Sequence, residues 1–275
     1  MPYPRAHYYV LIVVAVIIAG FWPSYFSVWG HVPWQFHAHG VAASLWVSMV
    51  AAQSWTAHHR QLPLHRKLGQ ASLFLFPFLI AGLAAIIDVT AKGFVAGGSP
   101  VRAMFGASFL IGIAIAMAAY VTVFYQALKN RRKVWVHAGF MLSTPIILFE
   151  SPFSRIVNAF VPGLTIRGLG DLHLLMPSIL LSMAVELAVI AVLWFRFRAK
   201  AMPFLVTGGF IVVEMLAMGL LQDSALLKSV LTALGHVPSA AIWLTGFAIG
   251  AATSWAGWTA GKRPSVAAPL AAQPA

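Results

Sequence analysis

The chain has 275 residues, of which 60% are hydrophobic and 9% are charged, a composition that excludes an ordinary soluble domain and predicts an integral membrane protein. The absence of cysteine excludes disulfides, thiolate haem ligation and zinc–thiolate sites. The formal net charge of +12 is attributed to basic loops that face anionic lipid, and we expect no nucleic-acid partner.

Eight segments reach the length of about 20 apolar residues that a spanning helix needs. In chain order they are approximately Tyr8–Phe26, Gln35–Ala57, Leu68–Thr90, Ala103–Leu128, Val136–Phe160, Leu172–Phe195, Phe204–Leu221 and Pro238–Trp258. Ser224–Leu234 is expected to form a short amphipathic helix at the membrane surface. The predicted fold class is all-α: a polytopic transmembrane helix bundle of about eight spans over residues 1–261, followed by a disordered cytoplasmic tail at 262–275.

The distribution of basic residues predicts the orientation of these segments. With the N-terminus placed in the cytoplasm, 13 of the 18 Lys and Arg residues fall on the cytoplasmic side. Cytoplasmic loops of membrane proteins carry an excess of Lys and Arg, so we expect both termini inside, in a bacterial inner membrane. The basic residues on the other side are Lys92, Arg102, Arg155, Arg167 and Lys228.

The ten histidines are concentrated near the ends of the predicted helices. Imidazole binds haem iron and other metals, and it exchanges protons near neutral pH. The predicted outer side carries His31, His37, His39, His173 and His236, and the predicted inner side carries His58, His59, His65 and His137. We therefore expect two histidine layers separated by about 30 Å, the thickness of a bilayer core.

A b-type haem needs two axial ligands, usually imidazoles on different helices. The natural pairs are His65 with His137 on the inner side and His39 with His173 on the outer side. Glycine permits the close approach of another group, and the glycines near these histidines suggest room for a porphyrin. These glycines are Gly40, Gly69 and Gly139.

The cofactor pocket is expected to draw on further polar residues. His39, Trp46 and Gln53 are seven residues apart and share one face of a helix, so Gln53 is expected to bind the cofactor. Arg66 is one of several inner basic residues that suit the haem propionates. Asp171 lies two residues before His173 and is placed to orient its imidazole.

Ionisable residues inside predicted spans are costly and usually face a bundle interior. Glu186 and Glu214 are expected near the middle of the membrane, where they would form a proton relay or bind a quinol or a cation. Asp88 and Glu150 also fall within spans. Pro145 and Pro152 are predicted to kink the fifth span.

The run His37-Ala38-His39-Gly40, followed by Trp46, Gln53 and His65-Arg66-Lys67-Leu68-Gly69, resembles a pattern in uncharacterised polytopic bacterial membrane proteins. Those proteins are similar to transmembrane b-type cytochromes. The resemblance covers residues 37–69 together with His137, and it implies haem binding and electron transfer. The chain departs from the familiar di-haem cytochromes because its fourth span lacks a histidine.

These observations predict a membrane redox protein that binds haem b and passes electrons within or across the membrane, with a quinol or a redox protein as partner. If it is an enzyme, we expect an oxidoreductase. One alternative is a non-haem copper, iron or zinc site, for which the candidate ligands are His37, His39, His65, His137 and His173. Two further alternatives are a proton-coupled transporter and an accessory or assembly subunit of a membrane complex. An oligomer is compatible with each of these.

Overall fold

The computed structural model describes residues 2–262. The α-helices are α1 (Ala6–Phe21), α2 (Trp34–His58), α3 (Leu62–Ala96), α4 (Pro100–Lys129), α5 (Val134–Ile147), α6 (Glu150–Phe160), α7 (Leu175–Phe197), α8 (Met202–Leu220), α9 (Ala225–Gly235) and α10 (Ser239–Ala260). Short 3₁₀ helices are η1 (Phe26–His31), η2 (Leu169–Leu174) and η3 (Arg198–Ala201). The described residues contain no strand, which confirms the all-α class. Except for Lys262, the predicted tail lies outside the described residues.

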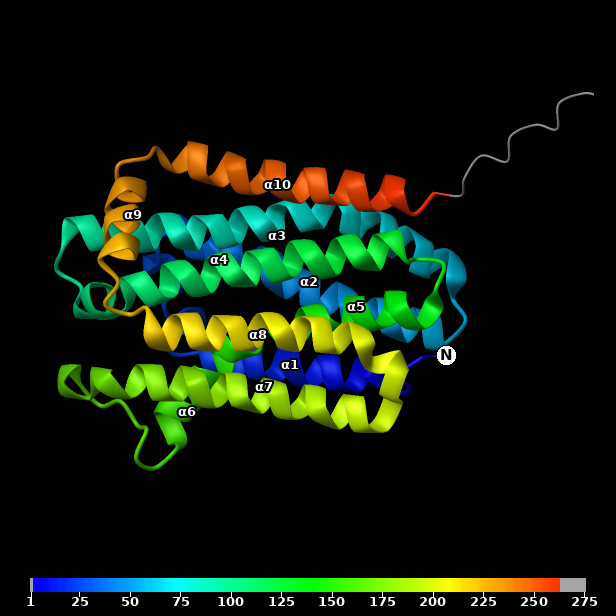
Figure 1. Ribbon diagram of the computed structural model, residues 1–275, viewed down its shortest axis with the longest axis horizontal. Coiled ribbons are helices and arrows are strands. Elements are labelled where there is room, and N and C mark those ends of the chain that lie inside the picture. The colour runs from blue at the N-terminus through cyan, green and yellow to red at the C-terminus, as the bar shows by residue number, and fades with distance from the viewer. Residues whose placement is uncertain (1, 263–275) are drawn as a thin grey trace, which may run out of the picture.

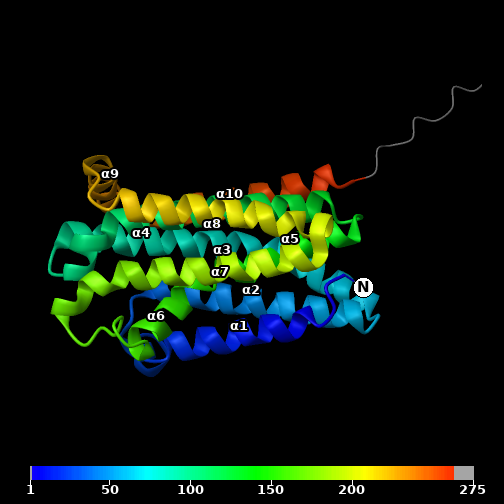
Figure 2. The ribbon, with the colours of Figure 1, turned by 60° about the horizontal axis from the view of Figure 1, so that its bottom comes forward.

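The long helices run up and down beside one another, and α9 lies across one end of the bundle (Figures 1 and 2). Helix α3 packs between α2 and α10, while α8 packs between α4 and α7. The first and last described residues lie at the same end, where α1, α3, α5 and α8 begin (Figure 1). We call this the basic end, because Arg66, Lys67, Arg132, Lys133 and other cations lie there.

Four described helical segments are long and apolar enough to cross a membrane, or five if the bent pair α9 and α10 forms one span. They are Leu62–Ala96, Pro100–Lys129, Val134–Phe160 and Leu169–Leu220. The structure thus has four to five candidate spans where the sequence suggested about eight. The last segment contains two helices, α7 and α8, which fold back on each other (Figure 1). Two other long helices do not qualify: α1 has only 16 residues, and polar side chains lower the mean hydropathy of α2.

The outer surface of the bundle is rich in large apolar side chains. Phe74, Phe195, Leu220 and Trp255 are each more than 60% exposed, and they come from different helices. Soluble monomers rarely expose extended apolar surface, because it is stable only against an apolar surrounding. This surface suits a protein that is embedded in lipid.

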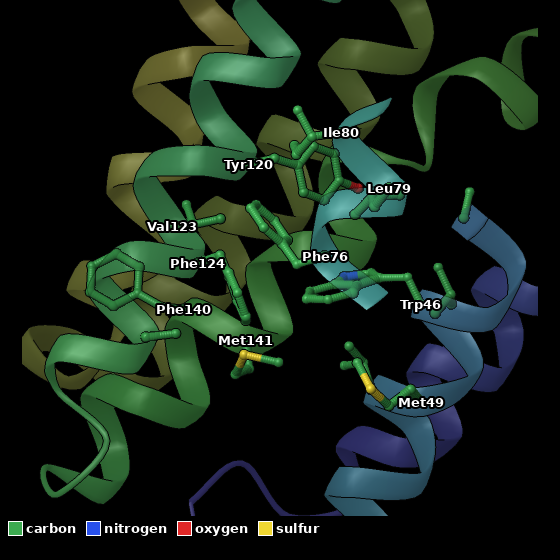
Figure 3. Close-up of a cluster of buried hydrophobic side chains, with 14 of the residues drawn as sticks. Trp46, Met49, Phe76, Leu79, Ile80, Tyr120, Val123, Phe124, Phe140 and Met141 are labelled. Atoms are coloured by element: carbon green, nitrogen blue, oxygen red, sulfur yellow. The ribbon is translucent and has the colours of Figure 1, made fainter. Parts of the chain in front are cut away.

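The core between α2, α3, α4 and α5 contains tightly packed aromatic rings (Figure 3). Phe76 stacks on Phe124 with ring centroids 4.1 Å apart, and Trp46 packs on both at 5.4 and 5.2 Å. The Trp46 indole donates a hydrogen bond to the Thr144 hydroxyl at 2.9 Å, so its polar edge is satisfied in an apolar core.

The conformation of the turn between α3 and α4 is explained by its own residues. Gly97 and Gly98 both have positive φ values, 71° and 77°, which glycine adopts without a steric penalty. Ser99 then caps α4 by accepting a hydrogen bond from the Arg102 N–H, and Pro100 occupies the first helical position. This arrangement sends α4 back along α3.

Asp88 connects three parts of the chain at the end opposite the basic end. Its carboxylate is 1% exposed, accepts a hydrogen bond from Gln35 of α2 at 3.0 Å and pairs with Lys92. Lys92 also donates to the Val237 carbonyl in the α9–α10 loop at 3.0 Å. Through Gln35 and Lys92, the Asp88 carboxylate holds α2, α3 and the α9–α10 loop together. This structural role explains why an ionisable residue lies within the predicted third span.

The fifth span is interrupted by two residues, Leu148 and Phe149, where the sequence predicted a kink. Helix α5 contains Pro145 and ends at Ile147, and α6 begins at Glu150. Pro152, in the first turn of α6, has no N–H to donate to the Leu148 carbonyl and its ring clashes with that carbonyl, which explains the break. By contrast, Pro77 lies inside the continuous helix α3, where α10 packs directly against it at Gly250.

Candidate functional site

Two histidines at the basic end share one hydrogen-bonding pattern. His65 lies in the first turn of α3, and its Nδ1 lies 3.1 Å from the Gln53 carbonyl oxygen of α2. His137 lies in the first turn of α5, and its Nδ1 lies 2.9 Å from the Ala127 carbonyl oxygen of α4. A carbonyl only accepts, so both Nδ1 atoms carry the proton and both Nε2 atoms keep a free lone pair. The two rings lie within range of each other's charge.

Several buried polar atoms near the basic end lack a protein partner. They lie at the end of α2 and the start of α1: Gln53 Oε1, Ser54 Oγ, His58 Nε2 and His7 Nδ1. The His7 ring lies 5.7 Å from the His58 ring, between centroids. Buried polar groups normally find partners, so this concentration marks the region as a candidate binding site. His7 was not expected there from the sequence, because its burial depends on packing against α2.

The glycines near the histidines are occupied by protein, which corrects the expectation that they make room for a porphyrin. A Cβ on Gly139 would lie 2.8 Å from Pro203 and 2.9 Å from the Tyr3 hydroxyl. A Cβ on Gly69 would lie 3.3 Å from the Gln53 amide, and one on Gly40 would lie 3.1 Å from the Tyr25 ring. These glycines therefore serve helix packing.

Tyr3 anchors the N-terminal segment at the basic end. Its hydroxyl donates to the Lys200 carbonyl at 2.5 Å, and its ring makes edge contacts with Trp135, Phe197 and Phe204. Burial raises the pKa of Tyr3 to about 12, so the hydroxyl remains a donor at physiological pH.

The outer histidines do not form one cluster. His37 contacts the Tyr25 hydroxyl through Nδ1 at 3.1 Å and packs on Trp29 with ring centroids 4.4 Å apart. Burial raises the pKa of Tyr25, which keeps its hydroxyl protonated as the donor to His37. His31, the last residue of η1, and His236, in the α9–α10 loop, are both exposed. The contacts of His37 with Tyr25 and Trp29 favour a structural role for this histidine.

No hydrogen bond or ring contact joins His39 to His173 in the described part of the chain. His173 is exposed on η2 and contacts the Gly170 carbonyl through Nδ1 at 3.0 Å. Asp171 does not orient this ring, because its carboxylate accepts hydrogen bonds from the backbone N–H groups of Arg167 and Gly168. Asp171 therefore stabilises the backbone at the start of η2.

His39 lies on the α2–α3 interface. Its backbone passes so close to α3 that a Cβ on Gly82 would lie 2.8 Å from the His39 Cα. The His39 Nδ1 is buried without a hydrogen-bond partner, and its ring lies within range of the charge of Arg155 on α6. His39 thus belongs to the packed α2–α3 interface, whereas His173 is exposed on η2.

The two glutamates expected near mid-membrane are influenced by the charge of a third, Glu150. Glu186 on α7 and Glu214 on α8 lie within range of each other's charge, and both lie within range of Glu150. The influence of Glu150 was missed because no local pattern reports how α6 packs on α7.

Among residues 2–262, no three histidine or acidic side chains are grouped closely enough to hold a metal ion. Arg66, expected to face a propionate, is exposed at the basic end. No protein-family model, curated protein or solved structure matches the chain.

Proposed function

We propose that the chain is an integral membrane redox protein in which His65 and His137 hold a b-type haem through their Nε2 atoms. The observation that supports this most directly is their shared hydrogen-bonding pattern. In each ring the Nδ1 contacts a backbone carbonyl of a neighbouring helix, at 3.1 and 2.9 Å, which leaves Nε2 free to bind metal. Metal-binding histidines commonly donate their other ring N–H in this way, which fixes the tautomer and the ring orientation.

The residues present at the basic end suit haem in two respects. Haem iron needs only two protein ligands, since the porphyrin nitrogens occupy the other coordination positions. Exposed cations that would receive the propionates lie beside the two histidines in sequence, and they include Arg66, Lys67 and Lys133. When bound, haem would supply one-electron chemistry. The chain would supply two imidazole ligands in a fixed orientation and the cations that receive the propionates.

A second candidate for the same two histidines is a non-haem copper, iron or zinc ion. The packed surroundings of Gly69 and Gly139 favour it, because a single ion needs less space than a porphyrin. Imidazole suits all three metals. Both candidates require His65 and His137, and they differ in their optical spectra.

For the whole chain we propose eight membrane crossings, formed by α1, α2, α3, α4, α5 with α6, α7, α8 and α10. Both termini would lie in the cytoplasm of a bacterial cell. The support is that these helices run side by side in alternating directions and that the basic loops lie at one end (Figure 1).

The test is an optical spectrum and a metal analysis of the full chain, purified after expression with added haem precursor. We expect a Soret band and about one haem per chain. His65→Ala and His137→Ala should each lower bound haem about tenfold or more, because each removes an axial ligand.

The matched controls are His31→Ala and His236→Ala, since both histidines are exposed at the opposite end of the bundle. They should retain the spectrum. A colourless protein that binds copper, iron or zinc through His65 and His137 would replace haem with the metal-ion candidate. A protein that binds neither haem nor metal would refute the redox proposal.

A further inference from the structure

A groove runs along the outer surface of the bundle where α3 and α10 lie side by side (Figure 1). It has a volume of about 340 Å³, and its walls are mainly aromatic. Phe74 and Phe78 come from α3, and Phe247, Trp255 and Trp258 come from α10. Phe74 is 76% exposed and Trp255 is 72% exposed, so the groove is open toward the surrounding lipid.

The groove has the length of an acyl chain in one leaflet of a bilayer. It extends from Trp258, near the basic end, to Phe247 in the middle of α10. These residues are eleven positions apart, which corresponds to about 16 Å along a helix. Half the thickness of a bilayer core is about 15 Å. An aliphatic chain therefore fits along the whole groove.

Ser254 contributes a hydroxyl group to this largely apolar lining. It is only 6% exposed, and its Oγ has no hydrogen-bond partner in the described part of the chain. By contrast, Thr245, Thr253 and Thr259 of the same helix each donate to a carbonyl one turn earlier. A buried hydroxyl without a partner is costly in an apolar environment. Ser254 therefore indicates a ligand that brings an oxygen acceptor into the groove.

Arg131 lies beside the end of the groove that is nearest the basic end. Its guanidinium lies over the Trp258 ring, 4.3 Å from the ring centroid. Its Nη1 donates to the carbonyls of Leu128 and Trp258 at 3.1 and 2.9 Å, which holds the side chain against α10. Among residues 2–262, no hydrogen bond occupies its Nε or Nη2. The remaining N–H groups of a guanidinium held in this way suit a phosphate.

The cations of the basic end have no acidic side chains beside them. Asp88, Asp171 and Asp223 lie at the opposite end, and the three glutamates lie on α6, α7 and α8. Both ion pairs among the described residues, of Lys92 with Asp88 and of Lys228 with Asp223, also lie at the opposite end. The basic end therefore draws its counter-charges from its surroundings, and anionic lipid headgroups supply them at a membrane surface.

We propose that the α3–α10 groove binds one anionic phospholipid. Its phosphate contacts Arg131, one acyl chain lies along the groove, and the ester carbonyl of that chain accepts a hydrogen bond from Ser254. The order of these groups agrees with the helix, because Ser254 lies one turn, about 6 Å, deeper than Trp258. The ester groups of a phospholipid are likewise deeper than its phosphate. The site does not depend on the haem proposal.

The test is native mass spectrometry of the full chain, delipidated in mild detergent and titrated with defined lipids. We expect dioleoyl phosphatidylglycerol to bind its tightest site at least about fivefold more tightly than dioleoyl phosphatidylcholine, whose phosphate is balanced by its own ammonium group. Ether-linked phosphatidylglycerol lacks the ester carbonyls. It should bind about threefold more weakly than the ester form, because it offers no carbonyl to Ser254.

Variants separate the two contacts. Arg131→Gln should remove most of the preference for phosphatidylglycerol, whereas Arg132→Gln, which changes the exposed neighbouring cation, should retain it. Ser254→Ala should abolish the difference between the ester and ether lipids. Thr253→Val is its matched control, because the buried Thr253 hydroxyl already donates to the Ile249 carbonyl.

The unsubstituted chain tests the proposal even if a variant fails to fold. Equal binding of phosphatidylglycerol and phosphatidylcholine would overturn it, and so would equal binding of the ester and ether lipids. Tighter binding of decylubiquinone than of phosphatidylglycerol, lost in Ser254→Ala, would also overturn it, because the groove would then hold a quinone ring instead of an acyl chain.

Discussion

At the scale of single residues, Thr144 joins three helices of the core. Its hydroxyl accepts from the Trp46 indole of α2 at 2.9 Å and donates to the Met141 carbonyl at 2.8 Å. Its own carbonyl accepts from the Tyr120 hydroxyl of α4 at 2.7 Å. Because water cannot replace these partners in a buried apolar core, each bond matters for the packing of α5.

We expect Thr144→Val to destabilise the protein by about 1–3 kcal/mol, because the buried Trp46 N–H loses its acceptor while the side-chain volume is kept. The free energy of unfolding is measured in mixed micelles by tryptophan fluorescence. Thr245→Val is the control, since its exposed hydroxyl bonds only to the Ala241 carbonyl of its own helix. Equal stability of the two variants would contradict the role of Thr144.

At the scale of elements, the contact between α3 and α10 depends on two glycines. A Cβ on Gly246 would lie 2.7 Å from the Ala84 Cβ, and one on Gly250 would lie 2.6 Å from the Pro77 Cα. The two glycines are four residues apart, which is the small-residue spacing that brings membrane helices close together. This spacing is visible in the sequence, but the partner helix is not.

Gly250→Leu should push α10 away from α3 and lower the free energy of unfolding by about 1–3 kcal/mol, as overpacked cores do. The same unfolding assay in micelles measures it. Gly209→Leu on α8 is the matched control, because no atom lies within 4 Å of a Cβ there. If both leucine variants lost the same stability, the close α3–α10 contact would not be the cause.

At the scale of the whole molecule, the number and direction of membrane crossings can be read with single cysteines, since the chain has none of its own. We propose that the α2–α3 and α4–α5 loops face the cytoplasm and that the α6–η2 and α8–α9 loops face outward. The positions to change are Gln61, Arg132, Arg167 and Asp223, which lie in these loops.

A membrane-impermeant maleimide should label Arg167→Cys and Asp223→Cys in intact cells. It should label Gln61→Cys and Arg132→Cys only after permeabilisation. The reverse result would invert the orientation, and labelling of Gln61→Cys and Arg132→Cys from opposite sides would contradict eight crossings. A cysteine-free parent provides the background.

Much of the fold was predictable because its signals are local. Apolar run length located the long helices, and the amphipathic segment before Pro238 is helix α9. Pro152, the second proline expected to kink the fifth span, predicted its weak point, because the clash of proline with its preceding turn depends only on neighbouring residues. The occurrence of His65 and His137 at helix starts near one end also followed from the alternation of the loops.

The sequence by itself thus determined a helical, lipid-facing bundle with histidines at its ends, since composition and periodicity act over a few residues. Only the tertiary structure decided which residues of different helices contact one another. It placed Pro203 and Tyr3 against Gly139, and it brought the rings of His65 and His137 to the carbonyls of Gln53 and Ala127. These contacts join different segments of the chain, so they depend on how whole helices pack against one another.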